Sequence, residues 1–323
     1  MKKVSAYQSS FESYLNNKDW GHGSATIYEP IQYILENGGK RFRPVLTLLA
    51  GDSLGKIEDL HYKFALGIEV FHNFTLLHDD IMDHADLRRG KASVHKRFGT
   101  NAAILSGDLM LILATQIIQS ACQESTRDLN DVLKLFLEVG QEICEGQDMD
   151  MHFEESSSGN MDAYEEMVRQ KTAVLLGFSL YAGARASDIP EELSKALYDY
   201  GVQSGIVFQM WDDYLDVFSA ETTGKRNAGD LYNRKETCLV IKLKEVMVAE
   251  DFGQFEMIWK NSMSDRDVEK IKSLFGKYDI KKTIEQIVQD KLNQAKRKIS
   301  STFSDEQISP ILNFTDQFIL RNK

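Results

Sequence analysis

Cysteine is scarce in this sequence, which has three among its 323 residues, at Cys122, Cys144 and Cys238. Their number is odd and their spacing is irregular, which disfavours both a disulfide scaffold and a zinc site. A reducing cytosol is the natural compartment for such a chain, and the first ten residues show no apolar segment of a signal peptide. We therefore expect a cytoplasmic protein.

Long apolar runs and excess positive charge are also lacking. The longest apolar stretch, at about 109–118, is interrupted by Thr115 and Gln116 and is far too short to span a bilayer, so we expect no stable membrane insertion. Asp and Glu number 49 against 38 for Lys and Arg, which gives a net charge of −11. This balance argues against a general nucleic-acid-binding protein, whereas local groups of arginine and lysine can still bind a small anionic substrate.

Proline is rare as well, with four residues, and strand-like alternation is scarce. Apolar residues instead recur at helical spacing, as in the segment 281–300, where they are Ile284, Ile287, Val288, Leu292, Ala295 and Ile299. Pro30, which suits a first helical turn, and the stop at Gly38-Gly39 predict a helix at about 30–37. We expect an all-α protein of roughly ten or more helices in a bundle, forming a single domain over residues 1–323.

Two acidic motifs of identical form lie in separate halves of the chain, each within apolar sequence that is compatible with a helix. They are Asp79-Asp80-x-x-Asp83, the first acidic motif, and Asp212-Asp213-x-x-Asp216, the second acidic motif. On a helix, positions i and i+4 share a face, so each motif presents two carboxylates in one direction. A single copy is more often solvated charge, but like charges on an apolar background need compensation. Mg²⁺ would supply it, because this ion commonly binds one or two carboxylates together with substrate phosphates.

Basic residues near glycines could complete such a site. One group lies in the segment 38–44 (GGKRFRP), Arg88-Arg89 follows the first acidic motif, and Lys225 and Lys235 follow the second. Arginine forks and lysine charges match phosphate oxygens. Each group alone could equally decorate a helix end, pair with the aspartates or lie in a solvated loop. Together with the acidic motifs, these cations predict a diphosphate ligand.

At these residues the chain resembles the trans-isoprenyl diphosphate synthases of the polyprenyl synthetase family, from about residue 25 to the C-terminus. The matching segments are GGKRFRP (38–44), FHNFTLLHDDIMDHADLRRG (71–90), GDLM (107–110), EGQDMD (145–150), QKT (170–172), FQMWDDYLD (208–216), GK (224–225), GDL (229–231) and Arg321-Asn322-Lys323. The run HNFTLLHDDIMD is particularly similar to geranylgeranyl diphosphate synthases of the archaeal type. The resemblance therefore points to the short-chain geranylgeranyl and farnesyl diphosphate synthases.

The resemblance implies the isoprenoid synthase fold, with mostly antiparallel helices around a deep central cavity, usually in a homodimer. It also implies a Mg²⁺-dependent reaction between small-molecule isoprenyl diphosphates. An allylic diphosphate (dimethylallyl, geranyl or farnesyl) ionises, isopentenyl diphosphate attacks the cation head-to-tail, and a proton is lost. The released diphosphate is the usual proton acceptor in the family, so no side chain is assigned as a general base.

The resemblance also implies roles for single residues. Three Mg²⁺ ions would bind with the diphosphate, with Asp79, Asp83 and Asp212 as direct ligands and Asp80, Asp213 and Asp216 as outer or water-mediated ones. The allylic diphosphate would contact Arg88, Lys171, Lys225 and Lys235. Isopentenyl diphosphate would contact Lys40, Arg43, His72 and Arg89, with Arg321 and Lys323 closing over it. Thr172 and Gln209 would stabilise the carbocation through side-chain oxygens, and Gln147 and Asp150 would support the lysine and the metal shell.

Some of these roles have ordinary structural alternatives, and one segment departs from the family. His72 taken alone could be a core or capping histidine, and Thr172 could bond back within its helix. The family commonly has Gly-Lys-x-Thr-x-Pro around Lys235, whereas this chain has neither the glycine nor the proline there. The resemblance therefore extends to the lysine and not to the glycine and proline positions around it.

The residues upstream of the first acidic motif are expected to set the product length. A helical turn of about 5.4 Å is comparable with one extended isoprene unit, so bulky groups one and two turns upstream can block a growing tail. The positions concerned are Phe71, Phe74 and Thr75, and Phe74 is where short-chain members of the family carry an aromatic residue. We expect a C15 (farnesyl) to C20 (geranylgeranyl) product, with C20 favoured because the first motif has no two-residue insertion. Phe71 and Phe74 could equally be ordinary core residues.

Two other functions fit part of the pattern. A terpene cyclase shares the fold and one DDxxD motif, but its second metal motif normally mixes Asn, Ser and Glu, and it needs no second group of diphosphate-binding cations. A non-catalytic partner subunit of a prenyl synthase tends to lose the acidic motifs, whereas both are intact here. A prenyl diphosphate synthase is therefore the main prediction.

Overall fold

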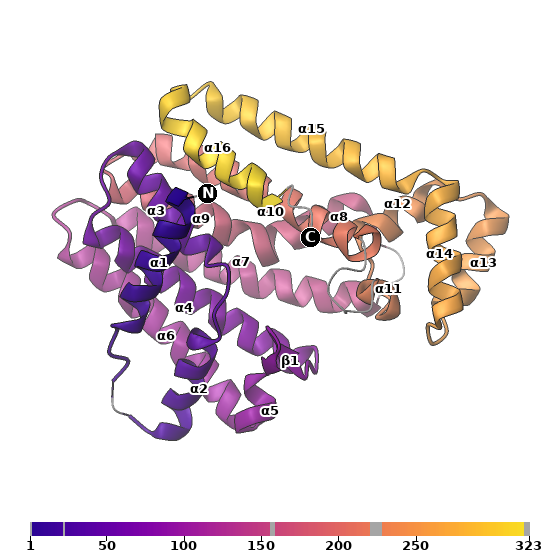
Figure 1. The fold of residues 1–323 in the computed structure, drawn as a ribbon, viewed down its shortest axis with the longest axis horizontal. Helices are drawn as coiled ribbons and strands as arrows, with labels where there is room; N and C mark the ends of the chain where they lie inside the picture. Colours follow the sequence, from indigo (N-terminus) through magenta and orange to yellow (C-terminus); the bar gives the residue numbers. More distant parts are fainter. Residues whose placement is uncertain (1, 22, 156–158, 220–227, 320–323) are drawn as a thin grey trace. The chain divides into compact units, whose positions relative to one another are not determined.

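The computed structural model describes residues 2–21, 23–155, 159–219 and 228–319, and over these residues the fold is almost entirely helical (Figure 1). The α-helices α1 to α16 and one π-helical turn, η1, follow one another along the chain. The prediction of an all-α protein with ten or more helices is confirmed.

One short β-hairpin interrupts the helices. Strand β1 (Leu87–Arg88) pairs antiparallel with β2 (Lys91–Ala92), with Leu87 opposite Ala92. Arg89 and Gly90 between the strands have φ angles of 54° and 79°, as a two-residue type I′ turn requires. This hairpin was not predicted from the sequence, and it sets the backbone of Arg88 and Arg89, which were expected to bind diphosphate.

The helices form two compact units, which are described separately. Unit 1 consists of residues 1–137 and 178–198, and unit 2 of residues 138–177 and 199–323. The boundaries fall within three helices, α7 (Asn130–Glu155), α9 (Val174–Ala186) and α10 (Glu191–Phe218). The single domain and the deep central cavity stay predictions.

In unit 1 the helix that carries the first acidic motif packs along a second long helix. Besides parts of α7, α9 and α10, this unit contains α1 (Lys2–Asn16), α2 (Ala25–Glu36), α3 (Phe42–Leu54), α4 (Asp59–Met82), the hairpin, α5 (Val94–Phe98) and α6 (Thr100–Glu124). Gly67 of α4 allows a close approach to α6, because an added Cβ would lie 2.7 Å from Cδ1 of Ile118. The contact between α4 and α6 thus fixes the first acidic motif within unit 1.

Helix α2 begins earlier than the sequence predicted. It extends over Ala25–Glu36, so Pro30 lies inside the helix rather than in the first turn of a helix at about 30–37. A proline in this position removes the hydrogen bond to the carbonyl four residues before it. Pro30 and its neighbour Ile31 are both buried, and this burial offsets the missing bond.

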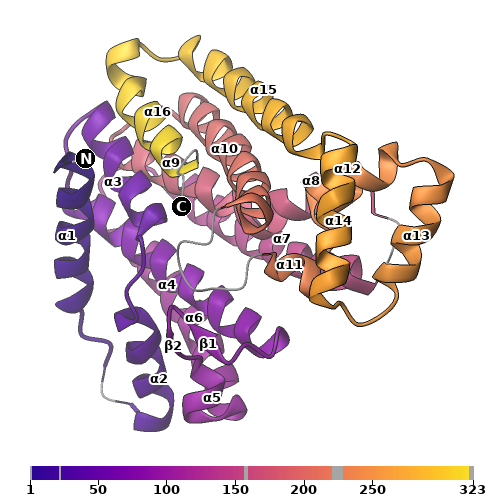
Figure 2. The same ribbon diagram turned by 45° about the vertical axis from the view of Figure 1, so that its right-hand side comes forward.

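Unit 2 places the predicted amphipathic segment in a long helix near the C-terminus. Besides parts of α7, α9 and α10, it contains α8 (Met161–Val168), η1 (Arg169–Ala173), α11 (Gly229–Tyr232), α12 (Cys238–Val246), α13 (Ala249–Trp259), α14 (Asp265–Lys277), α15 (Ile280–Ser300) and α16 (Asp305–Ile319). Helix α15 packs against α12, α14 and α16 (Figure 2). Of the apolar positions predicted for 281–300, Ile287 is partly exposed and the others are buried, which confirms the predicted stripe.

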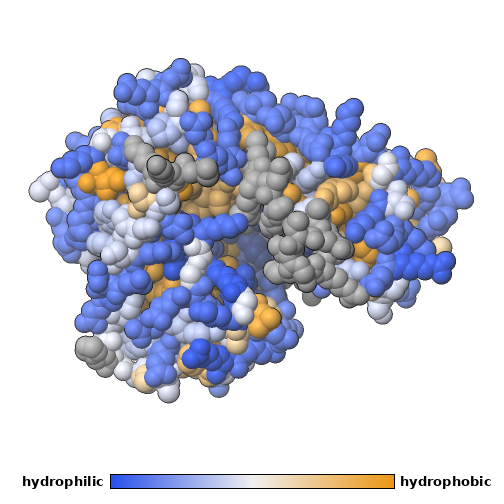
Figure 3. Space-filling view, in the orientation of Figure 1, coloured by the Kyte–Doolittle hydropathy of each residue, from blue (hydrophilic) through white to orange (hydrophobic). Residues whose placement is uncertain are grey.

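One face of the surface and one long apolar helix bear on the expected absence of membrane insertion. The face shown in Figure 3 is mostly hydrophilic, with apolar side chains in separate patches. Within the described part of the chain, α6 is long and apolar enough to cross a membrane, judged by length and composition alone. In α6, 33% of the apolar window is buried, and the helix packs against α4. A single helix of this kind is weak evidence for a membrane span.

Candidate functional site

The first acidic motif lies where α4 ends. Asp79 and Asp80 are in the last turn of the helix, and Asp83 is the C-cap residue, whose N–H donates to the carbonyl oxygen of Asp79 at 2.8 Å. Asp79 is partly exposed and Asp83 is exposed, whereas Asp80 is 1% exposed. The two outer carboxylates are thus accessible at a helix C-terminus, where the helix dipole disfavours negative charge and favours a cation.

The middle aspartate of this motif is paired with Arg88 of the hairpin. Nε and Nη2 of Arg88 both donate to Oδ1 of Asp80, at 2.9 Å and 2.5 Å. Among the described residues, Oδ2 of Asp80 has no hydrogen-bond partner. A buried carboxylate without a counter-charge is costly, so the arginine compensates it. This pair is the salt bridge that the sequence analysis left open for Arg88, and it holds a partly exposed guanidinium beside the motif.

Three of the residues predicted to bind isopentenyl diphosphate lie around one loop of unit 1. Nη1 of Arg43 lies 3.1 Å from Nε2 of His72, and Arg89 donates to the carbonyl oxygen of Gly38. Burial, followed by the charge of Arg43, holds the pKa of His72 well below its usual value, so the neutral ring can accept from Arg43. Burial lowers the pKa of Arg43 to about 10, which leaves this arginine charged at neutral pH.

We refer to Lys40, Arg43, His72 and Arg89 as the basic cluster. Lys40 is exposed in the loop that links α2 to α3. Gly39 in the same loop has a φ of 139°, and an added Cβ there would lie 2.9 Å from Cζ of Arg89. Glycine therefore permits the guanidinium to lie against the backbone. Arginines in such a cluster can match phosphate oxygens with paired N–H groups.

The second acidic motif, in α10, repeats the burial pattern of the first. Asp212 and Asp216 are partly exposed, whereas Asp213 is 6% exposed. Asp213 accepts hydrogen bonds from the Tyr164 hydroxyl at 2.6 Å and from the Gln209 side-chain amide at 3.0 Å. Burial raises the pKa of Asp213 to about 7. The middle aspartate is again the buried, hydrogen-bonded one, and the outer two reach the surface of their unit.

Lys171 and Thr172 lie in the π-helical turn η1, between α8 and α9. Nζ of Lys171 lies 2.5 Å from Oδ2 of Asp150 in α7. One turn before Asp150, an added Cβ at Gly146 would lie 2.3 Å from the backbone nitrogen of Lys171, so α7 and η1 approach each other closely at this glycine. π-Helical turns inside α-helices are frequent at functional sites.

These residues of unit 2 line one cavity of about 200 Å³. Six of the predicted site residues are brought together there, namely Asp150, Lys171, Thr172, Gln209, Asp213 and Lys235. Lys235 lines the cavity although the glycine and proline that the family usually has around it are absent. The cavity therefore combines two lysines with four carboxylates, those of Asp150, Asp213, Asp230 and Glu236, and with neutral polar side chains.

Among the lining residues that were not predicted, Asp230 and Tyr164 hydrogen-bond to the second acidic motif. The N–H of Asp230 donates to Oδ2 of Asp216 at 3.0 Å, and burial, followed by the charge of Asp216, raises the pKa of Asp230 to about 6. Asp230 belongs to the GDL segment (229–231) of the family resemblance, so a signal for it was available. Tyr164, the partner of Asp213, had no such signal, because a tyrosine in an amphipathic helix is usually a core residue.

The residues expected to set product length belong to an aromatic series in the core of unit 1. Phe71 and Phe74 are 1% and 7% exposed and pack edge to face with ring centroids 5.4 Å apart. Phe74 also packs against the ring of His78 at 5.0 Å, and Phe71 against Phe136 at 5.3 Å. Phe178 continues the series, 5.4 Å from Phe136. The sequence analysis named two of these five rings.

Of the remaining predicted site residues, Thr75 and Gln147 lie in the described helices α4 and α7. The hydroxyl of Thr75 donates to the carbonyl oxygen of His72 at 2.8 Å, within α4. Gln147 is partly exposed in α7, one residue after Gly146. Lys225, Arg321 and Lys323 lie outside the described residues.

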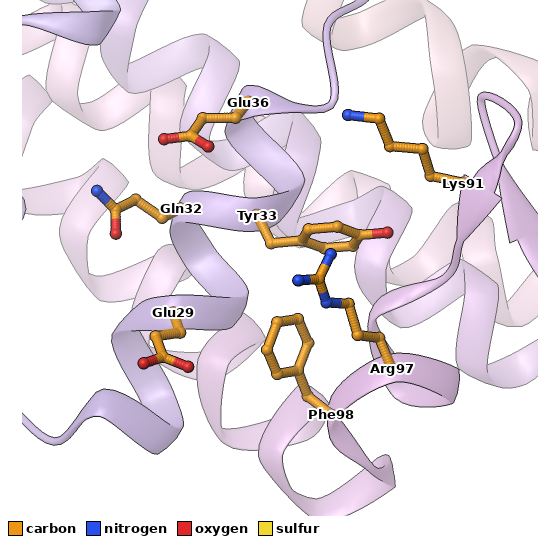
Figure 4. Close-up of a pocket in the computed structure, with 7 residues that line it drawn as sticks. All are labelled: Glu29, Gln32, Tyr33, Glu36, Lys91, Arg97 and Phe98. Atoms are coloured by element: carbon orange, nitrogen blue, oxygen red, sulfur yellow. The ribbon is translucent and has the colours of Figure 1, made fainter.

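A separate cavity of about 430 Å³ in unit 1 contains none of the predicted residues (Figure 4). The guanidinium of Arg97 lies 4.3 Å from the centre of the Tyr33 ring, and Lys91 extends from the hairpin. Glu29 and Glu36 line the same cavity from α2, so its charges are mixed and favour no anionic ligand.

The carboxylates suit Mg²⁺ bound together with a phosphorylated substrate. Within the described residues, no group of three or more His, Cys, Asp or Glu side chains is placed to hold a metal ion by itself. The accessible carboxylates instead occur as one pair in each acidic motif. Such a donor set fits Mg²⁺, which keeps several waters and takes substrate phosphate oxygens, rather than a zinc site closed by protein ligands.

Known proteins resemble this chain over most of its length. The model of the polyprenyl synthetase family matches residues 24–277. The geranylgeranyl pyrophosphate synthase of Geoglobus acetivorans is 42% identical over 251 residues, which are 77% of this chain and 76% of that protein. The geranylgeranyl diphosphate synthase of Methanosarcina mazei is 40% identical over 71% of each chain. A crystal structure of a geranylgeranyl pyrophosphate synthase superposes with a TM-score of 0.91 at 33% identity, covering 99% of each chain.

Proposed function

This chain belongs to the polyprenyl synthetase family, and we propose that it condenses isopentenyl diphosphate with an allylic diphosphate to give geranylgeranyl diphosphate (C20). It is a trans-prenyltransferase that makes short-chain prenyl diphosphates and releases diphosphate. The observation that carries the proposal is the shared pattern of the two acidic motifs. In each, the middle aspartate is buried and hydrogen-bonded, and the outer two carboxylates are accessible.

The aspartates are proposed to hold Mg²⁺. The direct ligands would be Asp79, Asp83 and Asp212, with Asp80, Asp213 and Asp216 supporting them. When bound, Mg²⁺ would neutralise charge on the leaving diphosphate as the C–O bond breaks. Asp80 contributes by holding Arg88, and Asp213 contributes by accepting from Tyr164 and Gln209. The number of ions is proposed to be three, which magnesium titration of the diphosphate complex would measure.

The cations are proposed to hold the two substrates. The basic cluster would bind isopentenyl diphosphate, while Arg88, Lys171 and Lys235 would bind the allylic diphosphate. Lys171 is already paired with Asp150, so its ammonium is held at the cavity wall before substrate arrives. Thr172 and Gln209 line the same cavity, and the dipoles of their side-chain oxygens are proposed to stabilise the carbocation. Lys225, Arg321 and Lys323 are proposed to join these groups.

Removing the metal should abolish synthesis. Purified protein is incubated with labelled isopentenyl diphosphate, each allylic primer and Mg²⁺, and the products are identified by mass spectrometry. We expect extended products with Mg²⁺, none in excess EDTA, and recovery when Mg²⁺ is restored, because the leaving diphosphate loses its counter-charge without the ion. No extended product with any primer would refute the proposed function.

The same assay separates the two alternatives. A terpene cyclase would release cyclic hydrocarbon from a single allylic diphosphate without consuming isopentenyl diphosphate. A partner subunit would give no product by itself and would change the product of another synthase. The basic cluster favours the synthase, because it provides a second group of diphosphate-binding cations that a cyclase does not need.

We also propose that the protein is a homodimer in the cytoplasm. Helix α6 exposes Ile104, Leu105 and Ile112, which are 40%, 53% and 54% exposed and lie on one face of the helix. Exposed apolar residues that share a helix face favour an interaction surface. Sedimentation velocity should give a dimer for the parent and a monomer for Leu105→Glu/Ile112→Glu. The control Met257→Glu, at a 66% exposed position of unit 2, should stay a dimer. A monomeric parent would contradict the proposal.

A further inference from the structure

Arg41 is the second cation of the loop between α2 and α3, and unlike Lys40 it lies in the core of unit 1. Its side chain is 3% exposed. Its backbone has φ 47° and ψ 38°, in the left-handed region, immediately before the first residue of α3. A residue with a Cβ is strained in this region, so strong side-chain contacts are needed to keep Arg41 there.

Two helices supply those contacts. Nη1 of Arg41 lies 2.7 Å from Oε1 of Glu69 in α4, and Nη2 donates to the carbonyl oxygen of Leu35 in the last turn of α2 at 2.6 Å. Glu69 is itself 2% exposed, and Nδ2 of Asn73 donates to the same Oε1 at 3.0 Å. Arg41 therefore ties the loop to the end of α2 and to the middle of α4.

This network is next to the basic cluster. Glu69 and His72 are three residues apart on α4, so they lie on the same side of that helix. Arg43, two residues after Arg41, reaches His72. The far end of the loop is held by Arg89, which donates to the carbonyl oxygen of Gly38. The backbone that carries Lys40 and Arg43 is thus anchored on both sides.

Stability alone does not explain a buried ion pair of this kind. Two charges lose their water when they are buried, and apolar residues of similar size are often at least as stabilising. The strained backbone of Arg41 adds a second cost. What the pair provides is a fixed geometry, because a guanidinium that bonds to a carboxylate and to a carbonyl oxygen can take few orientations.

We propose that Arg41, with Glu69 and Asn73, is a positioning residue that holds the loop so that Lys40 and Arg43 can receive isopentenyl diphosphate. The proposal rests on the proposed function, since it assigns the basic cluster to that substrate. Arg41 does not touch the substrate and acts through its neighbours. Its loss should therefore weaken binding of isopentenyl diphosphate and leave the allylic diphosphate unaffected.

The test uses the double variant Arg41→Met/Glu69→Met, which removes both charges and keeps apolar bulk in the core. We expect the KM for isopentenyl diphosphate to rise by ~10- to ~100-fold, since small misplacements of binding groups have effects of this size. The KM for the allylic diphosphate should change by less than about twofold, which is well below the rise expected in the KM for isopentenyl diphosphate. Arg41→Lys keeps the charge and one of the two contacts, so it should give an intermediate KM.

A matched control is available in the same unit. Arg185 also bonds a carboxylate and a backbone carbonyl, with Nε 2.8 Å from Oδ2 of Asp131 and Nη1 2.7 Å from the carbonyl oxygen of Ile189. The variant Arg185→Met/Asp131→Leu removes a comparable pair away from the loop. It should leave both KM values at the parent level, whatever it does to thermal stability.

Amide hydrogen exchange of residues 38–43 provides a second measurement that does not depend on turnover. We expect faster exchange in Arg41→Met/Glu69→Met than in the parent and in the Arg185 control. A parent KM for isopentenyl diphosphate, or parent protection of this segment, would overturn the positioning role. A parent protein that makes no product from any primer would instead refute the proposed function, and exchange would still decide whether Arg41 anchors the loop.

Discussion

Replacing Asp79 with alanine is expected to lower kcat by about 10³-fold or more, because metal-based charge stabilisation is worth several kcal/mol and each 1.4 kcal/mol is tenfold in rate. The fold should survive. Asp79 lies in the last turn of α4, where negative charge opposes the helix dipole, so its removal can add about 0.3–1 kcal/mol of stability. Steady-state kinetics and the thermal midpoint of the same preparations measure the two effects separately.

The matched control is Asp59→Ala, at the other end of the same helix. Asp59 lies in the first turn of α4, 2.9 Å from Nζ of Lys63 in an i, i+4 pair. Its loss should cost a few tenths of a kcal/mol, as for other exposed helical pairs of about 0.2–0.5 kcal/mol, without changing kcat. Near-normal turnover of Asp79→Ala would contradict the metal role, and an equal loss in both variants would indicate damage to α4.

The sequence could predict the acidic motifs and which helical positions share a face, because both follow from local spacing. It could not predict which aspartate of each motif is buried. That depends on Arg88, eight residues beyond Asp80 in the first strand of an unforeseen hairpin, and on Tyr164, which reaches Asp213 from another helix. The partner of a buried charge is a tertiary contact, and helical periodicity does not predict tertiary contacts.

Backbone features were likewise predicted where they depend on local sequence and missed where they depend on tertiary contacts. The all-α class followed from the apolar spacing and from the scarcity of proline, and α15 was predicted almost residue by residue. The π-helical turn at Lys171 was not predicted, since it accompanies a close approach to Gly146 of a different helix. The helix α2 was placed too late in the sequence because a proline preference was treated as a boundary, although burial of Pro30 allows the helix to pass through it.

The second large effect is expected at Phe74, where replacement by alanine should lengthen the product beyond C20. The Phe74 ring packs between His78 and Phe71, so its removal opens the first position of the aromatic series. The series continues one turn deeper with Phe71, and a turn of about 5.4 Å matches roughly one isoprene unit. We therefore expect C25 as the main new product, with Phe71 as the next barrier, measured by mass spectrometry of the dephosphorylated products.

A destabilised core could also alter the product, so the control variant must lose a comparable free energy of unfolding. Phenylalanine-to-alanine changes in a core cost about 3–5 kcal/mol, and Phe11 of α1 is as deeply buried as the residues of the series. Phe11→Ala should lose comparable stability and keep the parent product. If it produced the same longer chain as Phe74→Ala, the change would reflect general loosening of unit 1 rather than removal of the ring that blocks the tail.

The order of the rings makes the prediction sharper than a single substitution can. Phe71→Ala alone should leave the product at C20, because Phe74 still blocks the tail above it. Phe71→Ala/Phe74→Ala should extend the chain past C25, until the tail meets Phe136, which packs against Phe71 at 5.3 Å. If the rings block the growing tail one after the other, a deeper ring affects product length only after the shallower ring has been removed. If Phe71→Ala by itself lengthened the product as much as Phe74→Ala, the two rings would be ordinary core residues and would not block the tail in succession.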